Sequence, residues 1–313
     1  MSLIGSVLLP HDGSPLADST LPYAVELVRI TGASLELLRV LEELKPIYDS
    51  GLRTLVWIDP AHPRAELVAS EVLGPVVEKL MDQGLAAKTI VRVGDPRSEI
   101  LDEAETLANP LILLASHGRS GLSRFVFGSV ATRVLQTSQN PVMIVRAREA
   151  EEQPEAVSLK HIMVLLDGSD LSEKALPYAA ELARDSGGQL HLVRVAETYR
   201  DELPDKPPHI FTAPSYQAML EHFDELERQA RDYLAGVATR LEGELLSVTS
   251  EVLSGDPFRE IGKCSEREQP DLIVMTTHGR SGIARWFYGS VADRILTSTS
   301  TPVLLVRSGI ATS

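Results

Sequence analysis

Two segments of this chain combine glycine, serine, histidine and arginine in a pattern suited to binding phosphate. Residues 116–130 read SHGRSGLSRFVFGSV and residues 277–291 read THGRSGIARWFYGSV, with nine identical positions in fifteen. Glycine allows positive φ and lets the backbone approach a ligand without a Cβ in the way, so several N–H groups can converge on phosphate oxygens. The segments therefore predict two phosphate-binding loops. Glycines that only form a turn are the alternative interpretation.

Each loop is expected to end at the N-terminus of a helix. There the unpaired N–H groups carry roughly half a positive charge, which favours an anion. The hydroxyl of Ser129 either caps this helix or bonds a phosphate oxygen, and Arg119 either supplies charge to the phosphate or solvates the loop. The candidate contacts in both halves are Ala115, Gly118, Arg119, Gly128, Ser129, Val130, Thr276, Gly279, Arg280, Gly289, Ser290 and Val291.

Strand and helix patterns alternate around these loops. In the first half, apolar runs predict strands, and segments with helical periodicity lie between them. The strands are expected at Val7–Pro10, Ser34–Leu41, Lys88–Val93, Leu111–Ala115 and Pro141–Val145, and the helices after Leu21 with Gly32 as cap, and at Pro63–Gln83, Ser98–Ala108 and Ser129–Thr137. The stretch before Pro63 is expected to be mostly irregular. This alternation predicts an α/β fold, an open parallel sheet with helices on both faces, which binds ligands at the carboxyl ends of its strands.

The chain is a tandem repeat of two such domains. Its 313 residues exceed the roughly 100–200 of one average domain. Asp12 aligns with Asp167 at an offset of 155, whereas the loops align at an offset of 161, so the second half has gained six residues, which we place at 201–215. The sequence predicts domains at 1–148 and 158–313, joined by the charged linker 147–158.

Composition excludes several classes of protein. The net charge of -14 argues against generic binding to nucleic acid or to an anionic membrane. Cys264 is the only cysteine, so no intrachain disulfide or multi-cysteine metal site is expected, and a reducing compartment is favoured. The N-terminus lacks a signal-peptide pattern, and no apolar run approaches the roughly 18 residues needed to span a bilayer. We therefore expect a cytoplasmic protein. There is no Walker-type lysine motif and no G-x-G-x-x-G after the first strand.

The loops and their setting resemble the universal stress protein family, in its ATP-binding branch. Nine residues separate Gly118 from Gly128-Ser129, and nine separate Gly279 from Gly289-Ser290. The Asp-Gly-Ser turn after the first strand, the Gly-Asp-Pro turn and the terminal Pro-Val strand extend the resemblance over nearly the whole chain. It implies an adenine-nucleotide-binding, Rossmann-like sheet of five strands in each half. It also implies a pseudo-dimer of the two halves through their last strands, with a homodimer of chains as a further arrangement.

The resemblance also implies roles for residues outside the loops. The adenosine end of each nucleotide would meet residues at the ends of the first and second strands, namely Pro10, Asp12, Val40, Leu165, Asp167 and Val195. Asp12 and Asp167 have the alternative role of closing a turn. The family's glycine three residues before Gly118 and Gly279 is absent, because Ala115 and Thr276 stand there. Either that position needs only an extended backbone, or the second site is impaired.

An ATP-binding regulatory module is the favoured hypothesis, with ATP or ADP bound together with Mg²⁺ through its phosphates. The alternatives are a slow ATPase using His117 or His278, and a nucleotide-free scaffold that acts through protein contacts. No residue is assigned a catalytic role and no protein metal ligand is assigned. His11 has Leu166 as its counterpart, so the repeat does not require it, and Cys264 is expected to be a buried spectator on a helix.

Overall fold

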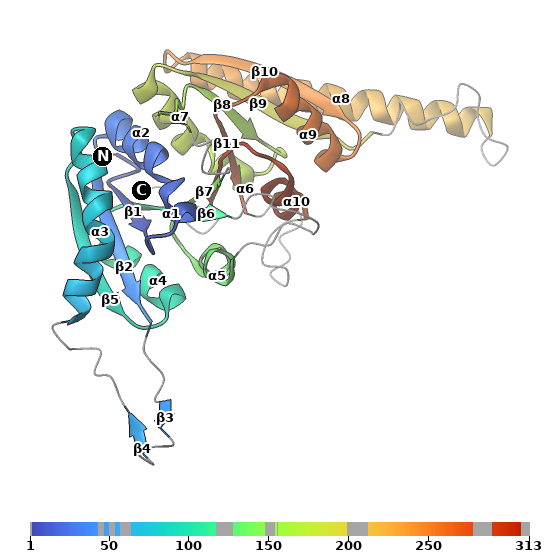
Figure 1. The fold of residues 1–313 in the computed structure, drawn as a ribbon. Coiled ribbons are helices and arrows are strands. Elements are labelled where there is room, and N and C mark those ends of the chain that lie inside the picture. The colour runs from blue at the N-terminus through green and yellow to red at the C-terminus, as the bar shows by residue number, and fades with distance from the viewer. Residues whose placement is uncertain are drawn as a thin grey trace. The chain divides into compact units, whose positions relative to one another are not determined.

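The computed structural model describes residues 2–42, 47–49, 54–56, 64–116, 128–147, 154, 156–198, 212–277 and 290–307. The chain divides into two compact units, Met1–Val157 and Ser158–Ser313. Each unit is an α/β domain in which parallel strands alternate with helices (Figure 1). The predicted fold class is confirmed.

The first unit contains five parallel strands in the order β5-β2-β1-β6-β7. Their bounds are β1 Ser6–Pro10, β2 Ser34–Leu41, β5 Ala87–Val93, β6 Pro110–Ser116 and β7 Val142–Arg146. The strands at the centre of this sheet are fully buried, since Leu8, Leu9 and Leu113 have no exposed surface. Such continuous apolar strands are typical of a parallel sheet covered on both faces.

Five helices of the first unit connect these strands. They are α1 Pro15–Asp18, α2 Leu21–Thr31, α3 Arg64–Asp82, α4 Pro96–Thr106 and α5 Ser129–Thr137. Right-handed crossovers place α2 and α3 on one face of the sheet, and α4 and α5, which pack on each other, on the opposite face (Figure 1). Helix α2 ends at Gly32, which adopts the left-handed conformation predicted for a C-cap.

The second unit repeats this arrangement with the strand order β10-β9-β8-β11-β12. Its strands are β8 His161–Leu165, β9 Gln189–Ala196, β10 Ser247–Ser254, β11 Leu272–Thr276 and β12 Val303–Val306. Its helices are α6 Asp170–Glu173, α7 Leu176–Ser186, α8 Ala213–Glu242, α9 Pro257–Glu268 and α10 Ser290–Ser298. Helix α8 has 30 residues whereas its counterpart α3 has 19, so part of the extra length of the second half lies in this helix.

Two local features differ from the expectation. The stretch before α3, which the sequence predicts to be mostly irregular, contains an antiparallel pair of short strands, β3 Ile47–Asp49 and β4 Thr54–Val56. Helix α4 begins at Pro96, two residues earlier than expected. The reason is that the Asp95 carboxylate accepts the N–H of Arg97 at 2.8 Å and caps the helix, with proline at its first position.

Across the described ranges, no helix combines the length and the apolar character that crossing a membrane would require.

Candidate functional site

The strand order reverses between β1 and β6 in the first unit and between β8 and β11 in the second. The strands that follow β1 or β8 in the chain lie on one side of this pair in the strand order, and the strand that follows β6 or β11 lies on the other side. Because parallel strands end at the same edge, Asp12 after β1 lies at the same edge as Ala115 near the end of β6, and Asp167 lies at the same edge as Thr276. This is the position at which open α/β sheets bind ligands.

Asp12 closes the turn that follows β1. Its Oδ1 accepts the N–H of Ser14 at 2.9 Å, while the residue remains exposed. Burial of the carboxyl raises its pKa, but the hydrogen bonds from Ser14 and the charge of Arg39 outweigh burial, so the pKa of Asp12 is lowered. Asp167 forms the equivalent turn in the second unit, since its Oδ1 accepts the N–H of Ser169 at 2.9 Å and the hydroxyl at 2.6 Å. The turn role of both aspartates is therefore present. Contact with a nucleotide stays a prediction.

The glycines that follow these aspartates are required by the same turns. Gly13 has φ +84° and Gly168 has φ +85°, which L side chains rarely adopt. A Cβ on Gly13 would lie 2.6 Å from Cγ1 of Val72, and one on Gly168 would lie 2.8 Å from the guanidinium of Arg194. The turn is thus held tightly against β9 in the second unit and against α3 in the first.

Arg39 and Arg194 belong to this edge of the two sheets and were not among the predicted site residues. Arg39 is near enough to lower the pKa of Asp12, and its Nε is buried without a hydrogen-bond partner in the part of the chain that the structure describes. Arg194 lies over the ring of Tyr233 at 4.9 Å. The sequence held a signal for both, because they occupy the same position in LLRVLE and HLVRVAE, at the offset of 155 found for the aspartates.

The remaining residues predicted for the adenosine end lie on the same strands. Pro10 pairs with Leu38 and Leu165 pairs with Val193 at the ends of β1 and β8. Val40 and Val195 each follow the arginine near the carboxyl end of β2 or β9, and both are half-buried. The structure brings these four positions to the same edge as the aspartates of their own unit.

Ala115 and Thr276 both lie within strands. Among the described residues other than glycine, only Asn109, Leu245 and Gln269 have positive φ, so Thr276 carries no backbone strain. The strand backbone at this position thus accommodates threonine. The two alternatives for ligand binding at this position both stay predictions.

Helix α5 begins without a side-chain cap. Gly128 occupies the N-cap position, its carbonyl accepts the N–H of Thr132 at 3.0 Å, and no side-chain cap is present among the residues that the structure describes. Helices α4 and α9 differ, since Asp95 and Asp256 cap them. Ser129 is exposed and is the first helical residue, so its hydroxyl does not serve as the cap. An uncapped first turn can hold an anion.

The other predicted loop residues are placed as follows. Val130 lies in the first turn of α5, and Ser290 and Val291 lie in the first turn of α10. The residues of the loops themselves, Gly118, Arg119, Gly279, Arg280 and Gly289, lie outside the described residues. His117 and His278 also lie outside them.

His11 is a buried side chain that supports the Asp12-Gly13-Ser14 turn of the first unit. It is buried, its Nδ1 accepts the N–H of Gly13 at 3.1 Å, and its Nε2 lies 3.1 Å from Oδ1 of Asp18. Asp18 in turn accepts a hydrogen bond from Lys79 Nζ at 2.8 Å. Burial lowers the pKa of His11 despite the opposing charge of Asp18. The imidazole is therefore neutral at neutral pH, with its proton on Nε2 facing the carboxylate.

Comparison with known proteins agrees with this architecture. The model of the universal stress protein family matches residues 4–146 and again residues 158–307. The chain belongs to the universal stress protein family. A universal stress protein of Mycolicibacterium smegmatis is 24% identical over 308 residues, covering 96% of both chains. The universal stress protein YxiE of Bacillus subtilis is 33% identical over 149 residues, which are 46% of this chain and 100% of YxiE.

Among solved structures, a universal stress protein from Archaeoglobus fulgidus has the same fold over both units. Its TM-score is 0.72 at 23% identity, covering 97% of this chain and 99% of the other. The tandem arrangement of two family domains in one chain is thus shared with a relative of known structure.

Proposed function

We propose that this universal stress protein binds ATP or ADP, with Mg²⁺ on the phosphates, and acts as a nucleotide-dependent regulatory module in the stress response. The observation that carries the proposal is the N-terminus of α5, which has no side-chain cap among the described residues. This helix follows β6, and the strand order reverses between β6 and β1, the strand that precedes Asp12. A helix end at such a point is suited to the phosphates of a nucleotide.

The residues present at this edge fit the proposed ligand. The N–H groups at Ser129 and Val130 would bind phosphate oxygens, and the Asp12 carboxylate would accept hydrogen bonds from the ribose or adenine. Arg39, whose buried Nε lacks a partner among the described residues, would find an acceptor on the ligand. The loop residues Gly118 and Arg119 would complete the contact with the phosphates.

The second unit is proposed to bind a nucleotide in the same way, through Asp167, the loop residues Gly279, Arg280 and Gly289, and the start of α10. Regulation would follow from mass action. A nucleotide shifts the protein between two states only by the difference in its affinity for them, so the activity of the module would follow the cellular supply of ATP.

Isothermal titration calorimetry with ATP and ADP, in the presence of Mg²⁺, tests this function. The variant Asp12→Asn keeps an oxygen to accept the N–H of Ser14 but removes the carboxylate, so its effect reports on the ligand rather than on the turn. We expect it to weaken binding to the first unit by about tenfold or more, the equivalent of about 1.4 kcal/mol for a lost charged hydrogen bond.

Asp102→Asn, on the exposed side of α4, is the matched control and should bind ATP as the wild type does. Failure of the folded wild-type protein to bind either nucleotide would overturn the proposed function and would favour a scaffold that works without nucleotide.

A further inference from the structure

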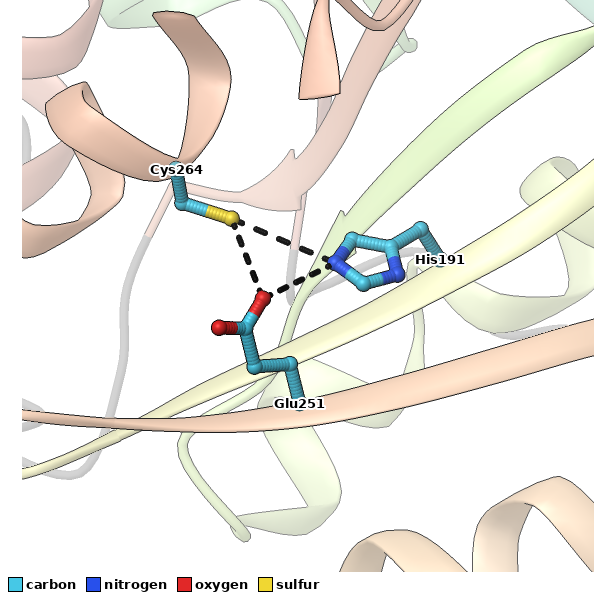
Figure 2. Close-up of side chains that lie close together, drawn as sticks. All are labelled: His191, Glu251 and Cys264. Carbon is cyan, nitrogen blue, oxygen red and sulfur yellow. Dashed lines mark hydrogen bonds and ion pairs between the residues drawn. The ribbon is translucent and has the colours of Figure 1, made fainter. Parts of the chain in front are cut away.

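Three side chains that can bind a metal converge in the second unit, on the face of the sheet covered by α9. His191 comes from β9, Glu251 from β10 and Cys264 from α9 (Figure 2). Sγ of Cys264 lies 3.9 Å from Nε2 of His191 and 3.7 Å from Oε2 of Glu251, and these last two atoms are 3.5 Å apart. Each donor atom thus faces the other two, as Figure 2 shows.

These separations are close to those of three ligands around one zinc ion. Zinc bonds sulfur at about 2.3 Å and nitrogen or oxygen at about 2.0–2.1 Å, which places tetrahedral ligands about 3.3–3.6 Å apart. Each observed separation needs to shorten by only about 0.1–0.4 Å. A mixed set of nitrogen, sulfur and oxygen donors is one that zinc accepts.

We propose that His191, Glu251 and Cys264 form a Zn²⁺ site with a fourth position open to water. The site does not depend on nucleotide binding, since none of its three residues belongs to the loops or turns described above.

Thr249 orients the imidazole for this role. Its Oγ1 lies 2.8 Å from Nδ1 of His191, and its hydroxyl donates to the carbonyl of Leu190 at 3.4 Å. With that hydroxyl proton committed to the carbonyl, the oxygen accepts the proton of Nδ1, and Nε2 is left as the atom with a lone pair. A second-shell hydrogen bond of this kind is typical of metal-bound histidine.

The burial of the three donors suits a site reached from one side. Cys264 has no exposed surface and the side chain of His191 is 9% exposed, whereas that of Glu251 is 31% exposed. The thiol of Cys264 donates to Oε2 of Glu251, and binding of zinc would release this proton as the thiolate forms.

Arg267 occupies the exposed side of the cluster. Its Nη2 contacts the carboxylate of Glu251 and lies 3.6 Å from Sγ of Cys264, and its Nε donates to Glu268 at 2.8 Å. This side chain is half-exposed and can turn outward when a cation arrives. Its guanidinium thus places a positive charge beside the carboxylate of Glu251.

The repeat shows that the cluster is particular to the second unit. Positions aligned with His191, Glu251 and Cys264 hold Glu36, Ile90 and Glu103 in the first unit. There the two buried carboxylates are neutralised by cations of β5: Lys88 lies 3.5 Å from Glu36, and Arg92 lies 2.5 Å from Glu103.

The second unit has lost both of those cations. Thr249 stands at the position of Lys88, and Leu253 stands at the position of Arg92. These cations are thus replaced together with the carboxylates that they neutralise in the first unit, and two of the replacements, His191 and Cys264, are proposed zinc ligands.

The test uses the full chain without an affinity tag and without nucleotide. Native mass spectrometry and calorimetry with Zn²⁺ should show one ion per chain. Co²⁺ in its place should give a tetrahedral visible spectrum with a charge-transfer band from the thiolate.

Cys264→Ala and His191→Gln should each weaken Zn²⁺ binding by more than about 100-fold, since loss of even an outer partner costs 10–100-fold. His222→Gln, on the exposed face of α8, is the control and should bind normally.

Two further variants separate a metal site from a hydrogen-bonded cluster. Thr249→Val should weaken Zn²⁺ binding by about 10–100-fold through misorientation of His191. Arg267→Gln should strengthen it, because a competing cation is removed. Thermal unfolding with EDTA establishes that each variant folds, and Zn²⁺ should raise the unfolding midpoint of the wild type but not of Cys264→Ala. Absence of a one-to-one complex, or equal Zn²⁺ affinity in the wild type and Cys264→Ala, would overturn the proposal.

Discussion

His11 and Asp12 are neighbours in the chain that contribute to the same turn from opposite sides. Asp12 is exposed at the edge of the sheet, whereas His11 is enclosed between Gly13 and Asp18. The charged residue can therefore meet a ligand, and the neutral imidazole holds the turn in place. Because burial of His11 favours its neutral form, the turn is coupled to pH.

This coupling predicts that acid destabilises the first unit through His11. The folded pKa lies below the ordinary value of 6.5, so below that pH the unfolded chain binds the proton more readily. The contribution of His11 to stability is fully present above pH 6.5 and is lost as the pH falls through that value toward the lower folded pKa. The free energy of unfolding, measured with urea between pH 8 and pH 5, should fall over this range.

His11→Leu is the variant to compare, because leucine stands at the aligned position 166. The difference in the free energy of unfolding between wild type and variant should shrink as the pH falls, while other histidines contribute equally to both proteins. A difference that stays constant from pH 8 to pH 5 would contradict the assignment.

At this scale the sequence predicts turns better than the contacts of side chains. Asp12 and Gly13 are recognisable because turn chemistry is local, and the Asx hydrogen bond spans only two residues. The link from His11 through Asp18 to Lys79 crosses 61 residues between its last two members, and no periodic pattern marks it. The cluster of Cys264 with His191 was missed for the same reason, since the two are 73 residues apart.

At the scale of elements, the transition from α7 to β9 shows how closely neighbouring strands approach. Gly187 ends the helix with φ +64° and has open space where a Cβ would lie. Gly188 is the next residue, and a Cβ there would lie 2.2 Å from the carbonyl oxygen of Lys160. Lys160 is the residue that precedes β8. That oxygen accepts the N–H of Gln189 at 2.6 Å and cannot move away without breaking the register of β8 and β9.

Alanine substitution of these adjacent glycines should therefore have unequal effects. Gly187→Ala should cost about 1–2 kcal/mol, the price of the left-handed conformation. Gly188→Ala should cost about 3 kcal/mol or more, because the added methyl meets backbone rather than a flexible side chain. Urea unfolding at neutral pH measures both. An equal loss of stability in the two variants would show that the strands separate more easily than the contact implies.

The elements themselves follow from the sequence where one periodicity dominates. Strand β2 and helix α5 have the predicted bounds, because each is a continuous pattern bounded by turn residues or a helix end. The start of α4 depends on a side-chain cap, and the β3–β4 pair depends on strands of three residues each, which are too short to show a period. Short elements and caps are thus the parts that pattern alone does not predict.

For the whole molecule, the two repeats share the residues at the carboxyl ends of the strands but differ on the face of the sheet covered by α4 or α9. Both units retain the aspartate turn, its glycine and the arginine of the second strand. On the face covered by α4 or α9, the two units differ: buried carboxylates pair with lysine and arginine in one, and histidine and cysteine stand with a glutamate in the other. The two units thus share the residues of the turn and differ in the charged residues of this face.

The nucleotide sites proposed for the two units predict two nucleotides per chain. Gly128 has φ -57° and ψ 153°, which any residue adopts, so Gly128→Val should leave the backbone unstrained while its side chain covers the first turn of α5. Gly289→Val makes the aligned change in the second half. Native mass spectrometry with ATP should show two nucleotides on the wild type, one on each single variant and none on the double variant. Because thermal unfolding in the absence of ATP should change little, lost nucleotide reports on the site rather than on the fold. Two nucleotides on Gly128→Val would place the phosphates away from α5, and one on the wild type would mean that the second unit has kept the turn but lost the ligand.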